Sequence, residues 1–296
     1  MPSFRSAKAQ AEHAVSQKIA LGHGRHDHRD DGQIHSVGTA RGYEQSLKGF
    51  ADYIQGHRLG DLRDATNEMA MQFLADRAEM VAQKTLDIDR QAIQMHLGVR
   101  LEVVKSERET HLSTRSYTQA QVERIASAQS ERNSLATQIA HNAGLRAHEL
   151  LTIRPVDERQ ASTHREWSAD RFAGREGERY TVEGKGGLVR EVLLTRDLAA
   201  RLEATRLAEP RQVIDRGVNY TQHYDLAGGR AWSQSFSAAS QRELGFSNGA
   251  HGLRHSYAQE RMDELQRGGM RYDDAKGTVA QEVGHFDKET TEAYLR

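Results

Sequence analysis

Apolar residues at helical spacing dominate the first third of the chain. One stripe falls at positions i, i+4, i+7, i+8 and i+11, which is the spacing of a single buried helix face. Its members are Tyr43, Leu47, Phe50, Ala51 and Ile54. Similar stripes predict a second helix over about 66–82, a third that Thr85 caps, and a fourth over about 101–107. We therefore expect residues 41–108 to form a small helical bundle.

A polar stretch over about 106–116 follows this bundle, and we interpret it as a linker. Thr118-Gln119-Ala120-Gln121 then forms a capping box, with Thr118 at the N-cap and Gln121 at N3. Helical spacing continues in several segments, which are residues 122–126, 135–139, 144–151, 197–208, 251–266 and 288–296. Residues 113–296 are therefore expected to form a second, mainly helical domain.

Strand signals are strong at one place only. Arg179–Val182 and Leu188–Leu194 are rich in β-branched and apolar residues, and they flank the turn sequence Gly184-Lys185-Gly186-Gly187. Two such runs around a glycine-rich turn predict a β-hairpin. The predicted fold class is therefore mainly α with a small antiparallel β-sheet.

Composition narrows the class of protein further. The chain has 296 residues, enough for about two domains, and 37% of them are hydrophobic, with a mean hydropathy of −0.77. No apolar run approaches the roughly 20 residues that a membrane span needs, so no membrane partner is expected. Cysteine is absent, which excludes disulfides, cysteine nucleophiles and Cys-ligated zinc and fits a reducing, cytoplasmic compartment.

Residues 1–40 are polar and are expected to form a flexible arm. Its four histidines, His23, His26, His28 and His35, could suggest a metal site, but no fixed element supports one, so no metal is expected. Lysine plus arginine total 41 against 42 acidic residues, a formal net charge of −1. A neutral total gives no global signal for nucleic acid, so any DNA-binding face must be local.

Several residues in the second half could carry chemistry. They are Arg146, Lys185, His251, Arg254, His285 and Tyr294. Each alone has a structural explanation: Arg146 in an apolar segment could pair with Glu149, three residues on. His251 and His255 are spaced like zinc ligands on a helix, but the glutamate of that motif is missing and Arg254 would repel a cation.

Together and in this order, these residues suit phosphoryl transfer through a covalent tyrosine. Two guanidinium groups can clamp the negative non-bridging oxygens of the transition state, and an imidazole can add a hydrogen bond. A phenol has a pKa near 10, so it needs a base and a cationic neighbourhood to act as nucleophile. A lysine can protonate the departing 5′-oxygen. A phosphotyrosine conserves the free energy of the phosphodiester, so rejoining needs no ATP.

The ordered set resembles the motifs of the tyrosine recombinase (phage integrase) family. The matching sequences are Gly144-Leu145-Arg146-Ala147-His148-Glu149-Leu150, Gly184-Lys185-Gly186, His251-Gly252-Leu253-Arg254-His255, and Gly284-His285 with Tyr294. The resemblance implies that residues 113–296 are a catalytic domain of this family and that residues 41–108 are a helical core-binding domain that contacts DNA.

The resemblance also implies a role for each residue. Tyr294 would attack the scissile phosphate and become a 3′-phosphotyrosine. Arg146 and Arg254 would hold the phosphate, and His285 would hydrogen-bond a non-bridging oxygen.

Lys185 would be the general acid for the 5′-hydroxyl. His251 would assist as acid or base, and Glu149 would orient the arginine region or simply form an ion pair.

The activity implied is site-specific DNA recombination or integration, of the kind encoded by bacterial mobile elements, without metal, ATP or another cofactor. Its partners would be double-stranded DNA with paired half-sites, three further copies of the chain in a tetramer, and an accessory bending or directionality factor, at the nucleoid. Two alternatives of the same fold remain: a topoisomerase- or resolvase-like DNA cleaver, and a DNA-binding protein without strand exchange. A metal-dependent transferase is a further alternative, and EDTA would inactivate it.

Overall fold

The computed structural model describes residues 6–21, 32–107, 114–184 and 187–295. The chain divides into two compact units, residues 1–112 and 113–296. The boundary falls within the polar stretch that the sequence predicts as a linker. None of the helices in the described ranges is long and apolar enough to cross a membrane.

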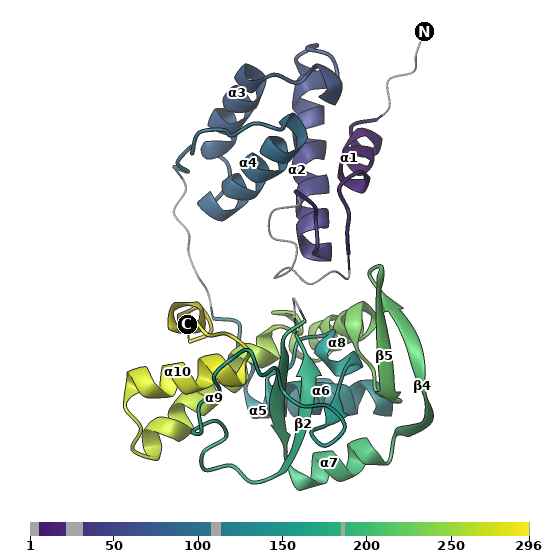
Figure 1. Cartoon of the computed structure of the whole chain (residues 1–296), viewed down its shortest axis with the longest axis vertical. Helices are drawn as coiled ribbons and strands as arrows, with labels where there is room; N and C mark the ends of the chain where they lie inside the picture. Colours follow the sequence, from purple (N-terminus) through teal and green to yellow (C-terminus); the bar gives the residue numbers. More distant parts are fainter. Residues whose placement is uncertain (1–5, 22–31, 108–113, 185–186, 296) are drawn as a thin grey trace. The chain divides into compact units, whose positions relative to one another are not determined.

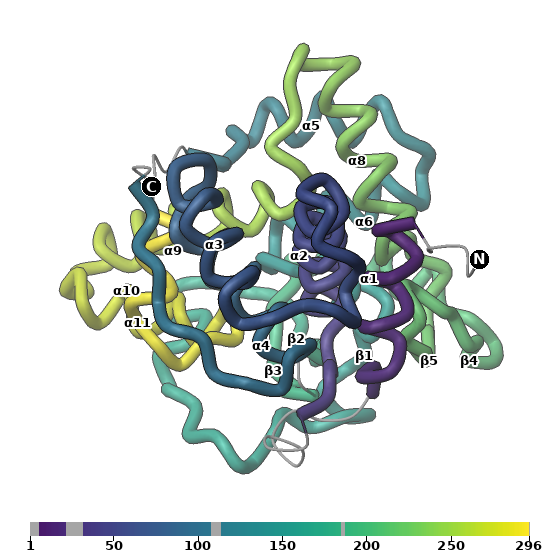
Figure 2. The backbone as a smooth tube through the Cα atoms, turned by 90° about the horizontal axis from the view of Figure 1, so that it is seen from above, coloured from purple at the N-terminus to yellow at the C-terminus, as the bar shows by residue number. Residues whose placement is uncertain are grey.

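The first unit is a helical bundle around α2 (Figures 1 and 2). Its elements are α1 (Ala7–Ser16), α2 (Val37–Gly56), the 3₁₀ turn η1 (Leu62–Asp64), α3 (Asn67–Ala78) and α4 (Gln83–Leu97). The predicted stripe lies on the inner face of α2, where Leu47, Phe50 and Ile54 are fully buried. The Phe50 ring packs against Phe73 of α3 with centroids 5.2 Å apart.

The expectation of a flexible arm over residues 1–40 is wrong for Ala7–Ser16. Ala7, Ala11 and Val15 recur every four residues and are buried in the same core as the inner face of α2. Alanine has the highest helix propensity, and small side chains allow close packing of α1 on α2. His35 lies against the carbonyl of Ala20, with Nδ1 3.0 Å from that oxygen. His23, His26 and His28 lie outside the described residues.

The helix expected over 101–107 is also absent, and this segment is irregular. Two of its backbone N–H groups donate to side chains of α4 instead of to a helical ladder. Leu101 N donates to Gln94 Oε1 at 2.9 Å, and Ser106 N donates to Gln83 Oε1 at 2.8 Å. These bonds satisfy polar backbone groups without a helix. The third helix begins at Gln83 with Ala82 as its N-cap, so Thr85 lies inside the helix and does not cap it.

The second unit is mainly helical with a small antiparallel sheet, as the sequence predicts, and it holds a second antiparallel sheet that was not expected. One sheet has the order β1–β2–β3 and the other pairs β4 with β5. Its elements are α5 (Gln119–Ser127), α6 (Glu131–Ala143), η2 (Glu149–Leu151), β1 (Arg154–Pro155), β2 (Glu178–Glu183), β3 (Val189–Leu194), α7 (Arg196–Glu203), β4 (Arg206–Asp215), β5 (Val218–Tyr224), α8 (Gly229–Leu244), α9 (Gly252–Arg267), α10 (Tyr272–Glu282) and α11 (Lys288–Glu292). The capping box at Thr118 and the β2–β3 hairpin are both confirmed.

The β4–β5 hairpin was missed. The helix expected over 197–208 ends at Glu203, and Arg206 already pairs with Tyr224 across the new hairpin. Most of β4 faces solvent and carries charged residues, so it lacks the apolar alternation of a half-buried strand. Its turn residues, Arg216 and Gly217, both have positive φ, at 53° and 81°, as a two-residue hairpin turn requires. Figures 1 and 2 show this hairpin at the end of the unit opposite α9 and α10.

The site of interest forms where α6, β3, α9 and α10 meet. Gly144 ends α6 in the left-handed region at φ 61°, and a Cβ there would lie 2.7 Å from the Tyr257 ring. Only glycine satisfies both conditions, so the chain can turn sharply under α9. Arg146 therefore lies in the turn between α6 and η2, and not at the start of a helix as expected.

Candidate active site

Glu149 is the centre of a buried cluster of charges. Its side chain is inaccessible to solvent, and its carboxylate accepts hydrogen bonds from Arg146 and Arg190. Arg146 donates through its backbone N at 2.8 Å and its Nη1 at 2.9 Å, and Arg190 Nη2 donates at 2.8 Å. Arg254 Nη1 lies 3.9 Å from the same carboxylate. The predicted ion pair between Arg146 and Glu149 is thus part of a larger network.

The electrostatics of this cluster favour a bound anion. Burial alone would raise the pKa of the Glu149 carboxyl, but Arg190, Arg146 and Arg254 outweigh burial and hold that pKa well below its usual value. One carboxylate therefore faces three guanidinium groups, which leaves an excess of positive charge. Arg146 keeps 22% of its side chain exposed, so it can reach a ligand.

Arg254 and Arg190 join the turn after α6 to the end of α10. Arg254 lies in the first turn of α9, is fully buried, and donates to the carbonyl oxygens of Gly144 and Val283. Arg190, on β3, donates to the Glu282 carbonyl at 2.6 Å. Sequence reasoning missed Arg190, although strand alternation places it on the same face as the buried Val192.

His285 follows α10 and meets both an arginine and the candidate nucleophile. Its Nε2 lies 3.1 Å from Arg146 Nη2 and 3.3 Å from Tyr294 Oη. A guanidinium can only donate, so Nε2 is the unprotonated, accepting nitrogen of a neutral ring. Desolvation and the nearby charges of Arg254, Arg146 and Arg190 lower the pKa of His285 to about 4, which keeps the ring neutral near pH 7.

Tyr294, just after α11, points into this cluster and is only 7% exposed. Its ring lies 5.5 Å from the Arg254 guanidinium carbon and 4.8 Å, centroid to centroid, from the His255 ring. Gln259 Nε2 donates to the Tyr294 carbonyl at 3.0 Å, which fixes the backbone of the tyrosine against α9. The phenol is therefore held among cations and imidazoles within its own unit.

His251 and His255 lie one turn apart at the start of α9 and are in contact. Their rings meet edge to face at 5.4 Å, and the His251 ring is 5.6 Å from the Tyr294 ring. Desolvation and the charge of Arg254 lower the pKa of His251. No group of three metal-ligating side chains converges anywhere in the described ranges. A zinc site at His251 and His255 would therefore have no third ligand among these residues. Sequence reasoning considered His255 only as a zinc ligand and missed its contact with the tyrosine.

Lys185 lies outside the described residues, but the residue before it does not. A Cβ on Gly184 would lie 3.4 Å from Glu149 Oε1 and 3.9 Å from Arg146 Nη1. The hairpin thus reaches the charged cluster at its last described position before Lys185. Five of the six predicted residues meet around one point: Arg146, His251, Arg254, His285 and Tyr294.

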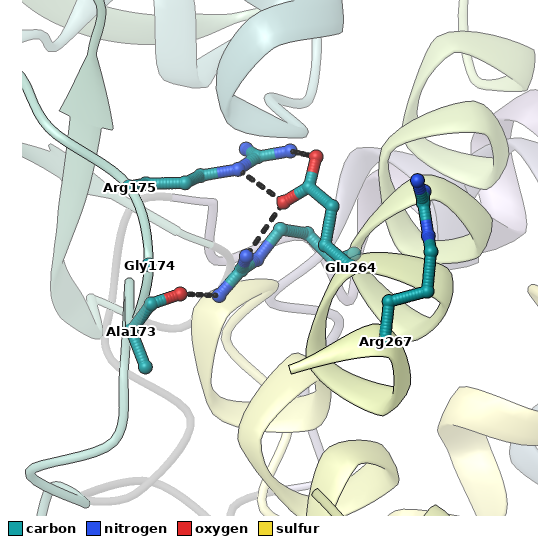
Figure 3. A pocket seen from close by; sticks show the side chains of 6 residues that line it. Ala173, Gly174, Arg175, Glu264 and Arg267 are labelled. Atoms are coloured by element: carbon teal, nitrogen blue, oxygen red, sulfur yellow. Dashed lines mark hydrogen bonds and ion pairs between the residues drawn. The ribbon is translucent and has the colours of Figure 1, made fainter. Parts of the chain in front are cut away.

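A pocket at the other end of α9 is also lined by charge (Figure 3). Arg175 approaches Glu264 with two hydrogen bonds of 2.8 Å, and Arg261 donates to the same carboxylate at 2.7 Å. Arg261 also binds Glu282 with two bonds of 3.0 Å. Here Arg175 and Arg261 are both paired with carboxylates, so their contacts hold α9 against α10, and the pocket is distinct from the cluster at Tyr294.

The fold is similar to those of site-specific recombinases and integrases of known structure. A XerH site-specific recombinase bound to palindromic difH substrate aligns with a TM-score of 0.58 and 16% identity, over 98% of this chain and 90% of that one. A lambda integrase tetramer bound to a Holliday junction aligns at 0.53 and 13%, over 97% and 80%. The Tn1549 transposon integrase with transposon right end DNA aligns at 0.51 and 14%, over 97% and 95%.

No family model and no curated protein matches the sequence. At identities of 13–16%, the structural similarity establishes the fold, and the predicted resemblance to tyrosine recombinases is confirmed at that level.

Proposed function

We propose that this chain cuts and rejoins DNA through a covalent 3′-phosphotyrosine at Tyr294, as a site-specific recombinase or integrase. The observation that carries the proposal is the contact chain from Tyr294 Oη to His285 Nε2 at 3.3 Å and on to Arg146 Nη2 at 3.1 Å. This contact chain supports an arrangement in which Tyr294 is the nucleophile, His285 the proton acceptor and Arg146 the cation that binds the phosphate. A core without this chemistry has no need to bury a phenol among three imidazoles and a guanidinium.

The proposed step is an in-line displacement at phosphorus. The Tyr294 oxygen forms a bond to phosphorus as the bond to the 5′-oxygen breaks, and Arg146 and Arg254 neutralise the charge on the non-bridging oxygens. For this, the guanidinium groups exchange part of their present contacts for the phosphate. Rejoining is the same step in reverse, with the 5′-hydroxyl as nucleophile.

Two protons move in this step. The phenol proton passes to His285 Nε2, which lies 3.3 Å from Tyr294 Oη and is freed when Arg146 turns from it to the phosphate. This role adds to the phosphate contact that the resemblance implies. His251, beside the same ring, assists. Lys185 gives its proton to the departing 5′-oxygen, a role supported by the approach of Gly184 to Arg146.

The proposed substrate is double-stranded DNA with paired half-sites, bound by the 41–108 bundle and the 113–296 unit. Most contacts would go to phosphates, so affinity would fall steeply with salt. Exchange between two duplexes calls for four copies of the chain, and the similar lambda integrase fold was solved as a tetramer on a Holliday junction. An accessory bending or directionality factor, a nucleoid location and an origin in a bacterial mobile element belong to the same proposal.

The test is covalent capture on nicked suicide duplexes carrying candidate sites. The wild type should form an adduct that survives SDS, and Tyr294→Phe should form none. Tyr220→Phe, which removes a hydroxyl on β5, is the matched control and should keep the adduct. An undiminished adduct from Tyr294→Phe refutes the assignment.

Two further arms separate chemistry from binding. Arg146→Ala should slow adduct formation by about 10²–10³-fold, the cost of removing one preorganised charge-stabilising group, with DNA affinity nearly unchanged. Collapse of binding instead would make Arg146 structural. EDTA should leave the adduct intact, whereas a metal-dependent transferase would lose activity.

A further inference from the structure

Residues 162–172 form a segment that is fastened to both the hairpin and the end of α10. Ser162 exchanges two hydrogen bonds with Val189 of β3, at 2.9 and 3.0 Å. Ser168 N donates to Gln281 Oε1 at 2.7 Å, at the C-terminal end of α10. Phe172 N donates at 2.7 Å to Glu282, two residues before Gly284. The segment is therefore fixed beside the turn that carries His285.

Two aromatic rings, one from this segment and one that follows His285, lie between two guanidinium groups. The rings of Trp167 and Phe286 lie 5.0 Å apart at 54°. Arg165 covers the Phe286 ring at 4.9 Å, and Arg171 covers the Trp167 ring at 4.5 Å. Trp167 Nε1 donates to the Ser162 carbonyl at 2.9 Å, which fixes the indole plane. The order Arg165–Phe286–Trp167–Arg171 is therefore an ordered cation–π stack.

The outer half of this stack faces solvent, and its cation has no ion-pair partner among the described residues. Phe286 is 37% exposed, Trp167 is half-buried, and Arg165 is exposed. Arg171 is mostly buried and lies 3.7 Å from Glu191, whereas Arg165 has no ion-pair partner in the described part of the chain. A half-exposed aromatic pair under an unpaired cation is what proteins use to hold a nucleotide, with stacking on the base and charge on the phosphate.

The position of the stack selects the nucleotide. Phe286 directly follows His285, so their Cα atoms are about 3.8 Å apart. One base step is about 3.4 Å along a duplex, so a phosphate held at His285 brings its neighbouring nucleotide within reach of Phe286.

We propose that Trp167, Phe286 and Arg165 form a stacking site for the nucleotide next to the phosphate that Tyr294 attacks. The exposed Arg165 moves from the Phe286 ring to the phosphate of this nucleotide, and the base takes its place against that ring. This site rests on the proposed function and adds a contact outside the reacting groups. It holds the end of the cut strand near the arginines, where it remains available for rejoining.

Tryptophan fluorescence tests the site directly, because the chain has only two tryptophans and Trp232 is 1% exposed. Binding is measured first, by titrating the protein into a trace amount of a nicked, fluorescein-labelled duplex of mixed sequence and following the anisotropy of the label. The tryptophan emission is followed with an unlabelled copy of the duplex. The wild type should lose a large part of its emission on binding, and Trp167→Phe should bind with little change in its remaining emission.

Arg165→Ala tests the phosphate contact in the same assay. Loss of one phosphate contact should reduce the slope of log affinity against log salt by about 0.9. Arg196→Ala is the matched control, because Arg196 is an exposed arginine on α7 with no aromatic neighbour in the described residues.

The outcomes separate the two proposals. Binding by anisotropy with unquenched Trp167, or an unchanged salt slope for Arg165→Ala, overturns the stacking site and leaves the proposed function standing. Absence of DNA binding at low salt overturns both. Quenching of Trp167 together with the reduced slope supports the stacking site.

Discussion

Replacing Glu149 with glutamine should destabilise the second unit strongly, although the change adds no volume. The carboxylate accepts three hydrogen bonds of 2.8–2.9 Å from Arg146 and Arg190. Glutamine keeps one acceptor oxygen. Its amide N–H₂ group replaces the second oxygen and faces arginine N–H groups, which then have no acceptor there. Glu149→Gln therefore removes the one carboxylate that contacts Arg146 within the described part of the chain, and it leaves buried positive charge uncompensated.

The expected size follows from the burial of the pair. Both Glu149 and Arg190 are at most 1% exposed, and breaking such a pair from one side costs about 3–5 kcal/mol. For a unit of this size each kcal/mol shifts the melting temperature by about 2–4 °C, so the transition should fall by about 6–20 °C. Adduct formation should fall as well, because Arg146 loses the partner that orients it.

Differential scanning calorimetry of the full chain is the assay, since the two units can then be followed as separate transitions. Glu176→Gln is the matched control: its carboxylate is 87% exposed and lies 3.7 Å from an exposed Arg196. Such a surface pair contributes about 0–1 kcal/mol to the free energy of unfolding, so the melting temperature of the control variant should change little. If Glu149→Gln shifts the transition no further than Glu176→Gln does, the reasoning about the buried cluster is refuted.

Three other predictions follow from the same contacts. Gly144→Ala should cost about 1–3 kcal/mol in urea unfolding, because φ is 61° and the new Cβ would meet Tyr257 at 2.7 Å. Lys276→Met should slow adduct formation several-fold without weakening DNA binding, because the Lys276 amine lies 3.4 Å from Glu292 and fastens the helix before the nucleophile; equal rates would contradict this. The pKa of His285 is about 4 in the folded chain against about 6.5 unfolded. The contribution of neutral His285 to the free energy of unfolding should therefore be fully present above pH 6.5 and should be lost as the pH falls toward 4. Thermal melts across this pH range measure the loss, and His285→Asn should make it smaller.

Local signals in the sequence were sufficient for much of this architecture. The α2 stripe, the capping box at Thr118 and the hairpin around Gly184 each depend on residues close together in the chain, so their patterns are visible without tertiary contacts. The motif residues from Arg146 to Tyr294 were found for a different reason: their chemistry is complementary even though their spacing is long.

The failures have a common physical cause, which is tertiary context. α1 is stabilised by packing of small residues such as Ala11 on α2, and a polar composition hides that face. The β4–β5 hairpin has too little buried apolar surface to show alternation. Arg190 and its partner Glu149 are 41 positions apart in the chain, and the residues around each of them give no local pattern that predicts the pair.

The shared carboxylate also leaves an expected evolutionary signature. Because Glu149 compensates Arg146, Arg190 and Arg254 together, a change at position 190 alone cannot offset the loss of its carboxylate. Positions 149 and 190 should therefore be retained together across descendants of this gene, whereas the solvent-exposed pair at 176 and 196 should vary freely.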